Sequence, residues 1–172
     1  SKEEYFDKFS LIQYYMDEPL ADPSAAALYF VANTASKHVK VALSGEGADE
    51  IFGGYPWYHR EEILFDDTFP WSRSQAIRES VLKKGILTKG REYVRARYLD
   101  SLAETDKLST DSPRDSRMRE MFMLNFNWFM QCLLDRKDRM SMYSGLEVRV
   151  PFCDYRIVEY AYNMPWQLKA YK

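Results

Sequence analysis

The sequence predicts an α/β fold in which helices predominate and the sheet contains one or a few parallel strands. Residues 39–43 (VKVAL) are the one convincing strand, because the segment is short, rich in valine and closed by Ser44-Gly45. A helical pattern precedes this strand and a glycine-rich turn follows it, which is the repeating unit of α/β folds. A lone strand forms no sheet. We therefore expect its partner strands to lie in sequence beyond these 172 residues rather than in another chain.

Two helices are expected before the strand. Aromatic and aliphatic residues at roughly helical spacing predict a first helix that runs through Met16. Asp22 followed by Pro23 is typical of an N-cap with proline at the first helical position. This second helix should end near Lys37 or His38, where cations favour the C-terminal end of a helix dipole.

The sequence after the glycine-rich turn is mostly helical. Residues 57–102 have a helical pattern with polar breaks, and residues 104–117 form a polar connection in which Ser112-Pro113 starts the next helix. From 118 to about 143, apolar residues fall on nearly every helical face, which predicts a helix buried inside a larger body. Asp154 should cap a last short helix.

Composition excludes several classes of protein. The 24 basic residues nearly balance the 26 acidic residues, which argues against a dedicated nucleic-acid binder. We find no apolar run of the roughly 18–20 residues that span a bilayer, so no membrane partner is expected. Cys132 and Cys153 are too few for a disulfide framework or a thiolate zinc cluster. We expect a cytoplasmic protein.

The segment SGEGADEIFGG is the first candidate site. Four of the seven glycines lie between Gly45 and Gly54, directly after the predicted strand. Glycine at such a position permits tight turns and lets a ligand approach the backbone closely. If a helix begins here, its free N–H groups form an anion site at the usual ligand position of an open α/β sheet.

Three acids in the same segment have two interpretations. Glu46, Asp49 and Glu50 lie three and four residues apart, so a helical turn would place them on one face. Carboxylates beside a phosphate-binding turn repel a nucleotide unless a cation intervenes, and magnesium accepts carboxylate and phosphate oxygens together. The alternative is plain helix capping, because acids in a first turn favour the dipole.

Two further segments contain polar residues in suggestive patterns. Residues 135–154 (DRKDRMSMYSGLEVRVPFCD) place alternating charges in apolar surroundings, where charges must be paired or bound to a ligand. The alternative is a structural salt-bridge network that braces two helices. Residues 17–25 (DEPLADPSA) form a turn followed by a helix start when they are considered alone.

Three segments, in this order and at this spacing, resemble the glutamine-dependent asparagine synthetase family. They are DEPLADPSA (17–25), LSGEGADEIFGGY (43–55) and DRMSMYSGLEVRVPFCD (138–154). The resemblance implies an α/β domain of the ATP-pyrophosphatase, adenine nucleotide α-hydrolase-like kind. Such a domain uses ATP and Mg²⁺ to adenylate aspartate. Ammonia from a glutaminase domain then converts the β-aspartyl-AMP to asparagine.

The resemblance also implies roles for residues around the glycine-rich turn. Ser44, Gly45 and Gly47 match positions that bind ATP. Glu46 matches a glutamate tied to forming and aminating the adenylate, with a role as general base toward ammonia. Asp49 matches a magnesium-binding aspartate.

A second set of positions matches residues near the family's aspartate pocket, either as substrate contacts or as their supports. They are Glu50, Asp138, Arg139, Glu147 and Arg149.

Other family features do not occur in residues 1–172. These are an SGGxDS-type pyrophosphate-binding loop, the glutaminase cysteine with its domain, and a lysine that stabilises the transition state. We therefore expect residues 1–172 to be the C-terminal part of a synthetase domain that is inactive alone. Surfaces that the rest of the protein would cover also favour self-association, so a homo-oligomer is a further expectation.

Two other functions fit the same segments. One is a related amide-forming enzyme, such as a β-lactam synthetase or a peptide-cyclising homologue, although these relatives change the residue at the Glu46 position. The other is a helical interaction module without catalysis. Intact Glu46, Asp49 and Glu50 argue against that loss.

Overall fold

The computed structural model describes residues 1–18, 24–83, 85–86 and 88–169. The chain forms two compact units, each built from separate parts of the sequence. Unit 1 contains Ser1–Gly47 and Phe129–Ile157, and unit 2 contains Ala48–Trp128 and Val158–Lys172. The chain therefore passes from unit 1 to unit 2 directly after the start of the glycine-rich turn.

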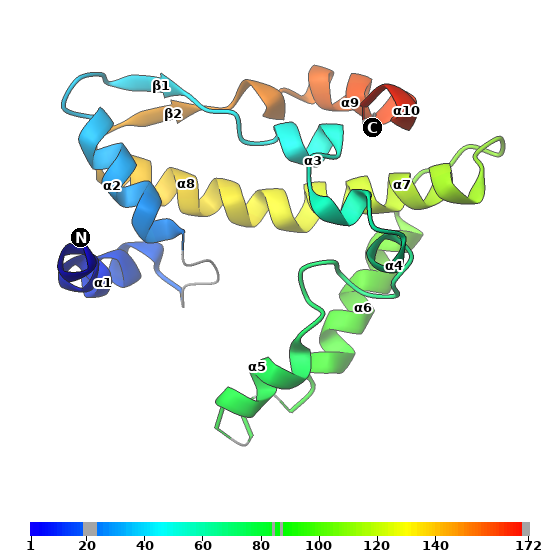
Figure 1. Ribbon diagram of the computed structural model, residues 1–172, viewed down its shortest axis with the longest axis horizontal. Coiled ribbons are helices and arrows are strands. Elements are labelled where there is room, and N and C mark those ends of the chain that lie inside the picture. The colour runs from blue at the N-terminus through cyan, green and yellow to red at the C-terminus, as the bar shows by residue number, and fades with distance from the viewer. Residues whose placement is uncertain (19–23, 84, 87, 170–172) are drawn as a thin grey trace. The chain divides into compact units, whose positions relative to one another are not determined.

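Helices account for most of both units (Figure 1). The elements of unit 1 are α1 (Lys2–Met16), α2 (Ala25–Ala35), β1 (Val41–Leu43), α8 (Gln131–Tyr143), β2 (Glu147–Arg149) and a 3₁₀ turn (Pro151–Cys153). Unit 2 contains α3 (Ala48–Phe52), a 3₁₀ turn (Pro56–Tyr58), α4 (Glu61–Leu64), α5 (Gln75–Val81), α6 (Gly90–Ala103), α7 (Pro113–Leu124) and α10 (Trp166–Lys169). Helix α9 (Tyr155–Asn163) begins in unit 1 and ends in unit 2. In the described part of the chain no helix is both long and apolar enough to cross a bilayer.

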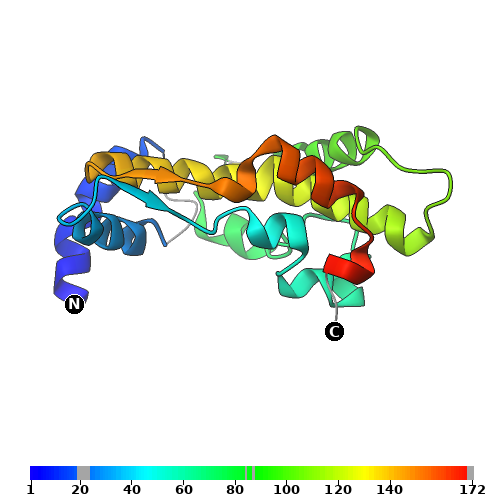
Figure 2. The same ribbon diagram turned by 90° about the horizontal axis from the view of Figure 1, so that it is seen from above.

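The sheet of unit 1 has two parallel strands, which confirms the predicted α/β class with few parallel strands. Figures 1 and 2 both show β1 beside β2, and the register pairs Val41 with Glu147. The partner of β1 thus lies within this chain, so the expectation that its partners lie elsewhere is wrong for this pairing. The signal was the alternation of apolar and charged residues in LEVRV, which has the period of a strand.

The core of unit 1 joins α1, α2 and α8. Its buried members come from all three helices: Ile12, Met16, Ala25, Ala26, Tyr29 and Met140. Helix α8 also contacts β2. Because these helices bury their apolar faces against one another, they hold the two short strands that would be marginal alone.

The segment from 118 to 143 differs from the single, fully buried helix that its composition predicts. It consists of α7, a π-helical segment (Asn125–Met130) and α8. Trp128 and Met142 are exposed, so the apolar residues do not all face a core. Long apolar side chains on a helix can remain at the surface, where single exposed examples are ordinary.

The predicted helix starts are mostly confirmed. Ser112 caps α7 by accepting a hydrogen bond from Asp115 N at 3.1 Å, and Asp154 accepts one from Arg156 N ahead of α9. Helix α1 ends at Met16 as expected. The predicted Asp22-Pro23 start of α2 lies outside the described residues.

Arg117 is the polar centre of unit 2. Its side chain is only 9% exposed, and its guanidinium donates to Leu64 O at 2.5 Å and to Asp66 O at 2.9 Å. It also pairs with Glu120 on the same helix at 2.7 Å. The arginine therefore ties α7 to backbone carbonyl groups at the end of α4.

The turn after β1 depends on glycine at position 47. Gly47 has φ of +93°, which side-chain-bearing residues rarely adopt. A Cβ atom at this position would also lie 2.8 Å from Cys153 Sγ. Gly45, by contrast, has no atom within 4 Å of its ideal Cβ position.

We predict that Arg117→Met lowers the free energy of unfolding by about 2 kcal/mol, because it removes the donor to Leu64 O, one of the donors to Asp66 O and one of the partners of the largely buried Glu120. Arg114→Met is the matched control on the same helix. Arg114 is half exposed and pairs with Glu61 at the surface, so its loss should cost less than about 1 kcal/mol. Urea unfolding measures both variants, and equal midpoints would contradict the role given to Arg117.

We predict that Gly47→Ala lowers the free energy of unfolding by about 1–3 kcal/mol, because alanine is strained at this φ and meets Cys153. Gly45→Ala provides the control in the same turn and should have little effect. Thermal unfolding of the two variants tests the difference. The two transitions would coincide if the turn could rearrange without strain.

Candidate functional site

Both carboxylate oxygens of Glu46 have a partner. Ser44 Oγ donates a hydrogen bond of 2.6 Å to Glu46 Oε2. On the other side, Lys137 Nζ lies 3.1 Å from Glu46 Oε1. The side chains of Glu46 and Lys137 are 14% and 19% exposed, so this ion pair is largely withdrawn from water. The carboxylate is held at both oxygens.

Three elements of unit 1 create this arrangement. The parallel ladder continues past β1, because Ser44 N donates to Arg149 O at 2.9 Å. Helix α8 supplies Lys137. The 3₁₀ turn after β2 supplies Cys153, whose thiol donates to Glu46 O at 3.7 Å. The position of Glu46 is therefore set by the sheet, by the helix and by the segment that follows β2.

The ion pair and the hydrogen bond compensate for the withdrawal of the Glu46 carboxylate from water. A largely buried carboxylate is costly unless a cation and hydrogen bonds compensate its lost hydration. Lys137 supplies the cation and Ser44 a hydroxyl. A carboxylate has about four lone-pair positions, so these two contacts leave capacity to accept a proton. The arrangement suits a base.

The three predicted ATP-binding positions differ in accessibility. Gly45 is exposed and the space around its Cα is open, so its backbone can be approached closely. Gly47 is buried against Cys153 and serves the turn itself. Ser44 is half-buried and its hydroxyl binds Glu46. Their predicted ATP contacts remain predictions.

The prediction that three acids share one helical face is wrong. Helix α3 begins at Ala48, and Gly47 interrupts the helical geometry before it, so Glu46 lies outside the helix. Within α3, Asp49 is exposed whereas Glu50 is buried. Neighbouring helical residues point about 100° apart, which separates the two carboxylates.

Asp49 occupies a position that depends on Gly54. A Cβ atom at Gly54 would lie 2.0 Å from Asp49 Oδ1, so only glycine leaves room for this carboxylate. The side chain of Asp49 remains exposed. Among the described residues, no group of three or more His, Cys, Asp or Glu side chains gathers as a metal site. A magnesium ion held by one or two carboxylates together with phosphates and waters fits this donor set.

Glu50 faces the interior of unit 2. It is 1% exposed, and Tyr55 donates a hydrogen bond of 2.5 Å to Glu50 Oε1. Tyr58, which is also buried, donates to Glu50 O at 3.1 Å. Burial, together with the charge of Glu50, raises the pKa of Tyr58 well above its usual range. These contacts brace α3 against the following turn, and the predicted substrate role of Glu50 remains a prediction.

The later charged cluster is not embedded in apolar surroundings as its sequence suggests. Asp138, Glu147 and Arg149 are exposed. Arg149 pairs with Glu147 two residues before it on β2 at 2.8 Å. Arg139 pairs with Asp135 one helical turn before it at 2.9 Å.

Each of these two ion pairs lies within one element, so neither pair itself joins two helices. The spacings i,i+2 on a strand and i,i+4 on a helix place partners on one face. Asp138, Glu147 and Arg149 are exposed and Arg139 is half-buried. Their predicted roles near substrate remain predictions.

Lys137 is the residue of this site that the sequence analysis missed. It lies next to the predicted Asp138 but points about 100° away from it. Its position in the helix places it on the inward face, because Lys137 lies four residues after Leu133 and four before Ser141, and both of these residues are buried. A lysine on the buried stripe of a helix needs a partner, and here the partner is Glu46.

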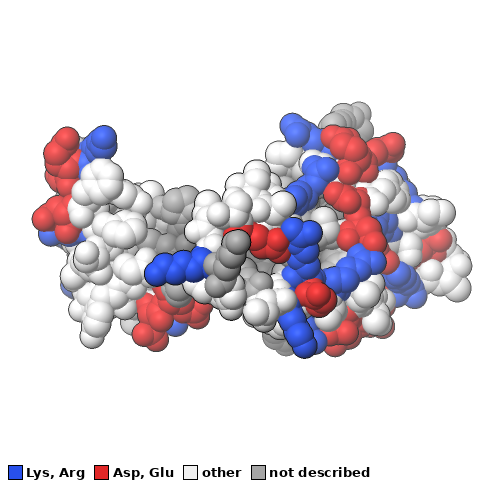
Figure 3. Space-filling model, turned by 90° about the horizontal axis from the view of Figure 1, so that it is seen from below, with Lys and Arg blue, Asp and Glu red and all other residues white. Residues whose placement is uncertain are grey.

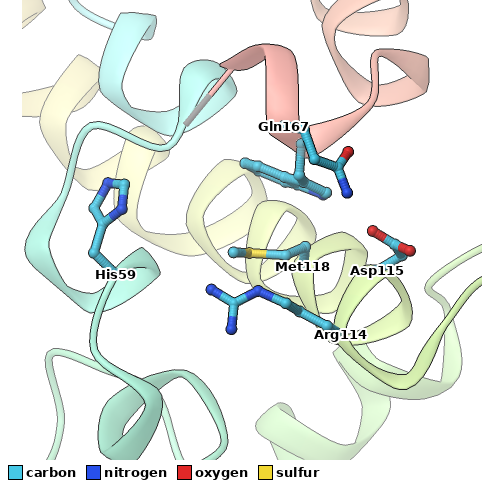
Figure 4. A pocket seen from close by; sticks show the side chains of 6 residues that line it. His59, Arg114, Asp115, Met118 and Gln167 are labelled. Carbon is cyan, nitrogen blue, oxygen red and sulfur yellow. The ribbon is translucent and has the colours of Figure 1, made fainter. Parts of the chain in front are cut away.

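Each unit contains at least one hollow among its described residues. In unit 1, a cavity of about 180 Å³ is lined by residues of α2, β1, α8 and the segment around β2, including Ser44 and Lys137. In unit 2, a cavity of about 110 Å³ has Arg114, Asp115 and Met118 on one side and Gln167 on the other (Figure 4). Both charges of the second cavity already have local partners, Glu61 and Ser112.

Charges of both signs are interspersed on the protein face drawn in Figure 3. In unit 2, several charged side chains are paired, as in Arg95 with Asp67 and Arg91 with Glu79. These pairs lower the pKa of each acid, chiefly through the hydrogen bond from the arginine. Exposed pairs of this kind contribute little to stability.

Comparison with known proteins identifies the family. The family model described as asparagine synthase matches residues 1–172. Asparagine synthetase [glutamine-hydrolyzing] 3 of Bacillus subtilis (strain 168) is 47% identical over 154 residues, which cover 88% of this chain and 25% of that protein. Asparagine synthetase [glutamine-hydrolyzing] 1 of the same organism is 33% identical over 205 residues, covering 99% of this chain and 32% of that protein.

A third relative is the putative asparagine synthetase [glutamine-hydrolyzing] of Mycobacterium tuberculosis (strain ATCC 25618 / H37Rv). It is 33% identical over 198 residues, which cover 96% of this chain and 30% of that protein. The matches thus cover a quarter to a third of these relatives. Since the family model spans every residue of the sequence, the chain belongs to the asparagine synthase family.

Proposed function

We propose that residues 1–172 are part of the synthetase domain of a glutamine-hydrolysing asparagine synthase. In this proposal the complete protein uses ATP to activate aspartate and uses ammonia from a glutaminase domain to form asparagine. Family membership supports the reaction class. The observation that carries the proposal to this site is the carboxylate of Glu46, held at both oxygens beside an exposed glycine turn.

The proposed reaction has two steps. A carboxylate is a poor electrophile, so the side-chain carboxylate of aspartate first attacks the α-phosphorus of ATP and releases pyrophosphate. The resulting β-aspartyl-AMP contains a mixed anhydride, in which AMP is a competent leaving group. Ammonia then attacks the carbonyl carbon, a proton leaves the nitrogen, and AMP departs to give asparagine.

Glu46 is proposed as the base that removes this proton. A general base must have a free lone pair, be oriented toward the attacking group and lie within hydrogen-bond reach of it. The ion pair with Lys137 and the hydrogen bond from Ser44 fix the orientation of the carboxylate. Gly45, exposed one residue earlier, is proposed to let the nucleotide approach the backbone.

Magnesium is proposed to bind at Asp49. The ion would neutralise phosphate charge, which is the usual contribution of Mg²⁺ to nucleotide chemistry. The exposed Asp49 carboxylate, given room by Gly54, is the candidate ligand. Glu50, Asp138, Arg139, Glu147 and Arg149 are proposed to bind or support the aspartate substrate.

We predict that Glu46→Gln in the complete synthetase lowers the rate of asparagine formation by about 10²–10⁴-fold, because the amide keeps the shape but accepts no proton. Asparagine production measures the whole reaction, and aspartate-dependent exchange of pyrophosphate into ATP measures the first step alone. Glu3→Gln, a change at the exposed start of α1, is the control. Wild-type asparagine production by Glu46→Gln would remove the basis of the proposal.

We predict that Asp49→Asn raises the Mg²⁺ concentration needed for half-maximal activity, because the amide is a weaker ligand for a hard cation. Gly54→Ala should shift the Mg²⁺ curve in the same direction by displacing the Asp49 carboxylate. Asp100→Asn, an exposed position on α6, should leave the curve unchanged. Superimposable Mg²⁺ titrations for all four proteins would rule out Asp49 as a ligand.

A further inference from the structure

We propose that Lys137 is the positioning residue for Glu46. Its ammonium holds one carboxylate oxygen while Ser44 holds the other, so that Glu46 presents one orientation to the incoming nucleophile. This inference rests on the proposed function, in which Glu46 is the base. It adds a residue outside the set predicted from the sequence, and it assigns that residue an effect on the base rather than on a substrate.

The contact geometry supports a two-point hold. Lys137 Nζ lies 3.1 Å from Glu46 Oε1, and Ser44 Oγ lies 2.6 Å from Glu46 Oε2. A glutamate side chain has three rotatable bonds, and a single contact leaves part of this freedom. Two contacts at different oxygens restrict the carboxylate much more strongly, which is what a base needs to stay within about 0.5 Å of its productive position.

The placement of Lys137 is itself determined by packing. Leu133, Lys137 and Ser141 form an i, i+4, i+8 stripe on the inward face of α8. The lysine lines the apolar cavity of unit 1, so its methylene chain can lie along apolar surface while the ammonium reaches the carboxylate. Helix α8 thus positions the Lys137 ammonium and also contributes to the core of unit 1.

The groups around Glu46 distinguish Lys137 from its neighbours. The Cys153 thiol from the 3₁₀ turn contacts the backbone carbonyl of Glu46 and not its carboxylate. Arg136, directly before Lys137, donates to Ser24 Oγ. Arg139 and Arg149, which follow Lys137 in the sequence, pair locally with Asp135 and Glu147. In unit 1, the cation that the structure places against the Glu46 carboxylate is Lys137.

Stability alone does not explain an ion pair between Lys137 and Glu46 at this position. Replacing a buried ion pair by apolar side chains of similar volume is often neutral or stabilising. Lys137 lines a cavity with apolar walls, where methionine would pack well. Retaining a charge there is better explained by what it does to Glu46.

The test uses the complete synthetase with Lys137→Met. We expect kcat for asparagine formation to fall by about ten- to a hundredfold, the range typical of residues that orient a functional group. The KM values for ATP and aspartate should change little, because Lys137 acts through Glu46. Lys137→Arg keeps the cation and should retain more activity. Lys137→Gln, which is neutral but polar, repeats the comparison if the methionine variant unfolds.

Two controls separate positioning from structure. Lys8→Met makes the same chemical change at a half-exposed lysine of α1 that pairs with Asp7, and it should leave kcat unchanged. In the Glu46→Gln background, Lys137→Met should cause no further loss, because the group that it positions is gone. A purely structural lysine would cause the same loss in both backgrounds.

The outcomes distinguish the two proposals. If Glu46→Gln loses activity while Lys137→Met matches Lys8→Met, the role of Lys137 is overturned and the proposed function stands. Additive losses in the double variant overturn the inference as well. If Glu46→Gln retains wild-type activity, the proposed function fails, and the inference about Lys137 fails with it.

Discussion

The parallel pairing of β1 with β2 is the constraint on which the candidate site depends. Each strand has three residues, and the two come from distant parts of the sequence. Their ladder extends to Ser44, whose N–H binds Arg149 O. This one additional hydrogen bond fixes the residue that holds one oxygen of Glu46. Because only three residues separate α8 from β2, the same strand pairing also places Lys137 near the turn that follows β1.

Hydrogen-bond ladders this short are stable only because helices cover them. Two three-residue strands form too few hydrogen bonds to offset the entropy of ordering the chain. The buried contacts of α1, α2 and α8 contribute the missing stabilisation. Ser44 and Glu46 therefore depend on an apolar core to which they do not belong. Substitutions in that core should alter the site indirectly, through the strand pair.

The fold and the site were predictable from the sequence to different extents. The strand at Val41, the cap at Ser112 and the end of α1 at Met16 follow from local chemistry, which acts over a few residues. The pairing of β1 with β2 does not, since LEVRV gives only a short alternating pattern and the choice of partner depends on tertiary packing. The same limit applies to charges. Asp138 and Lys137 are neighbours of similar polarity, and only the register of α8 decides that one is exposed and the other faces Glu46.

Surface ion pairs and the Glu46–Lys137 pair differ in how firmly their side chains are held. Arg139 and Arg149 are satisfied by partners within their own elements and remain at the surface, where water screens them. Glu46 and Lys137 are withdrawn from water, where their attraction is stronger and the loss of either partner more costly. A carboxylate held in this way needs no reorganisation when a nucleophile arrives, because its orientation was set when the unit folded. The order of dependence therefore runs from the core to the strand pair, from the strand pair to Ser44, and from Ser44 and Lys137 to the proposed base.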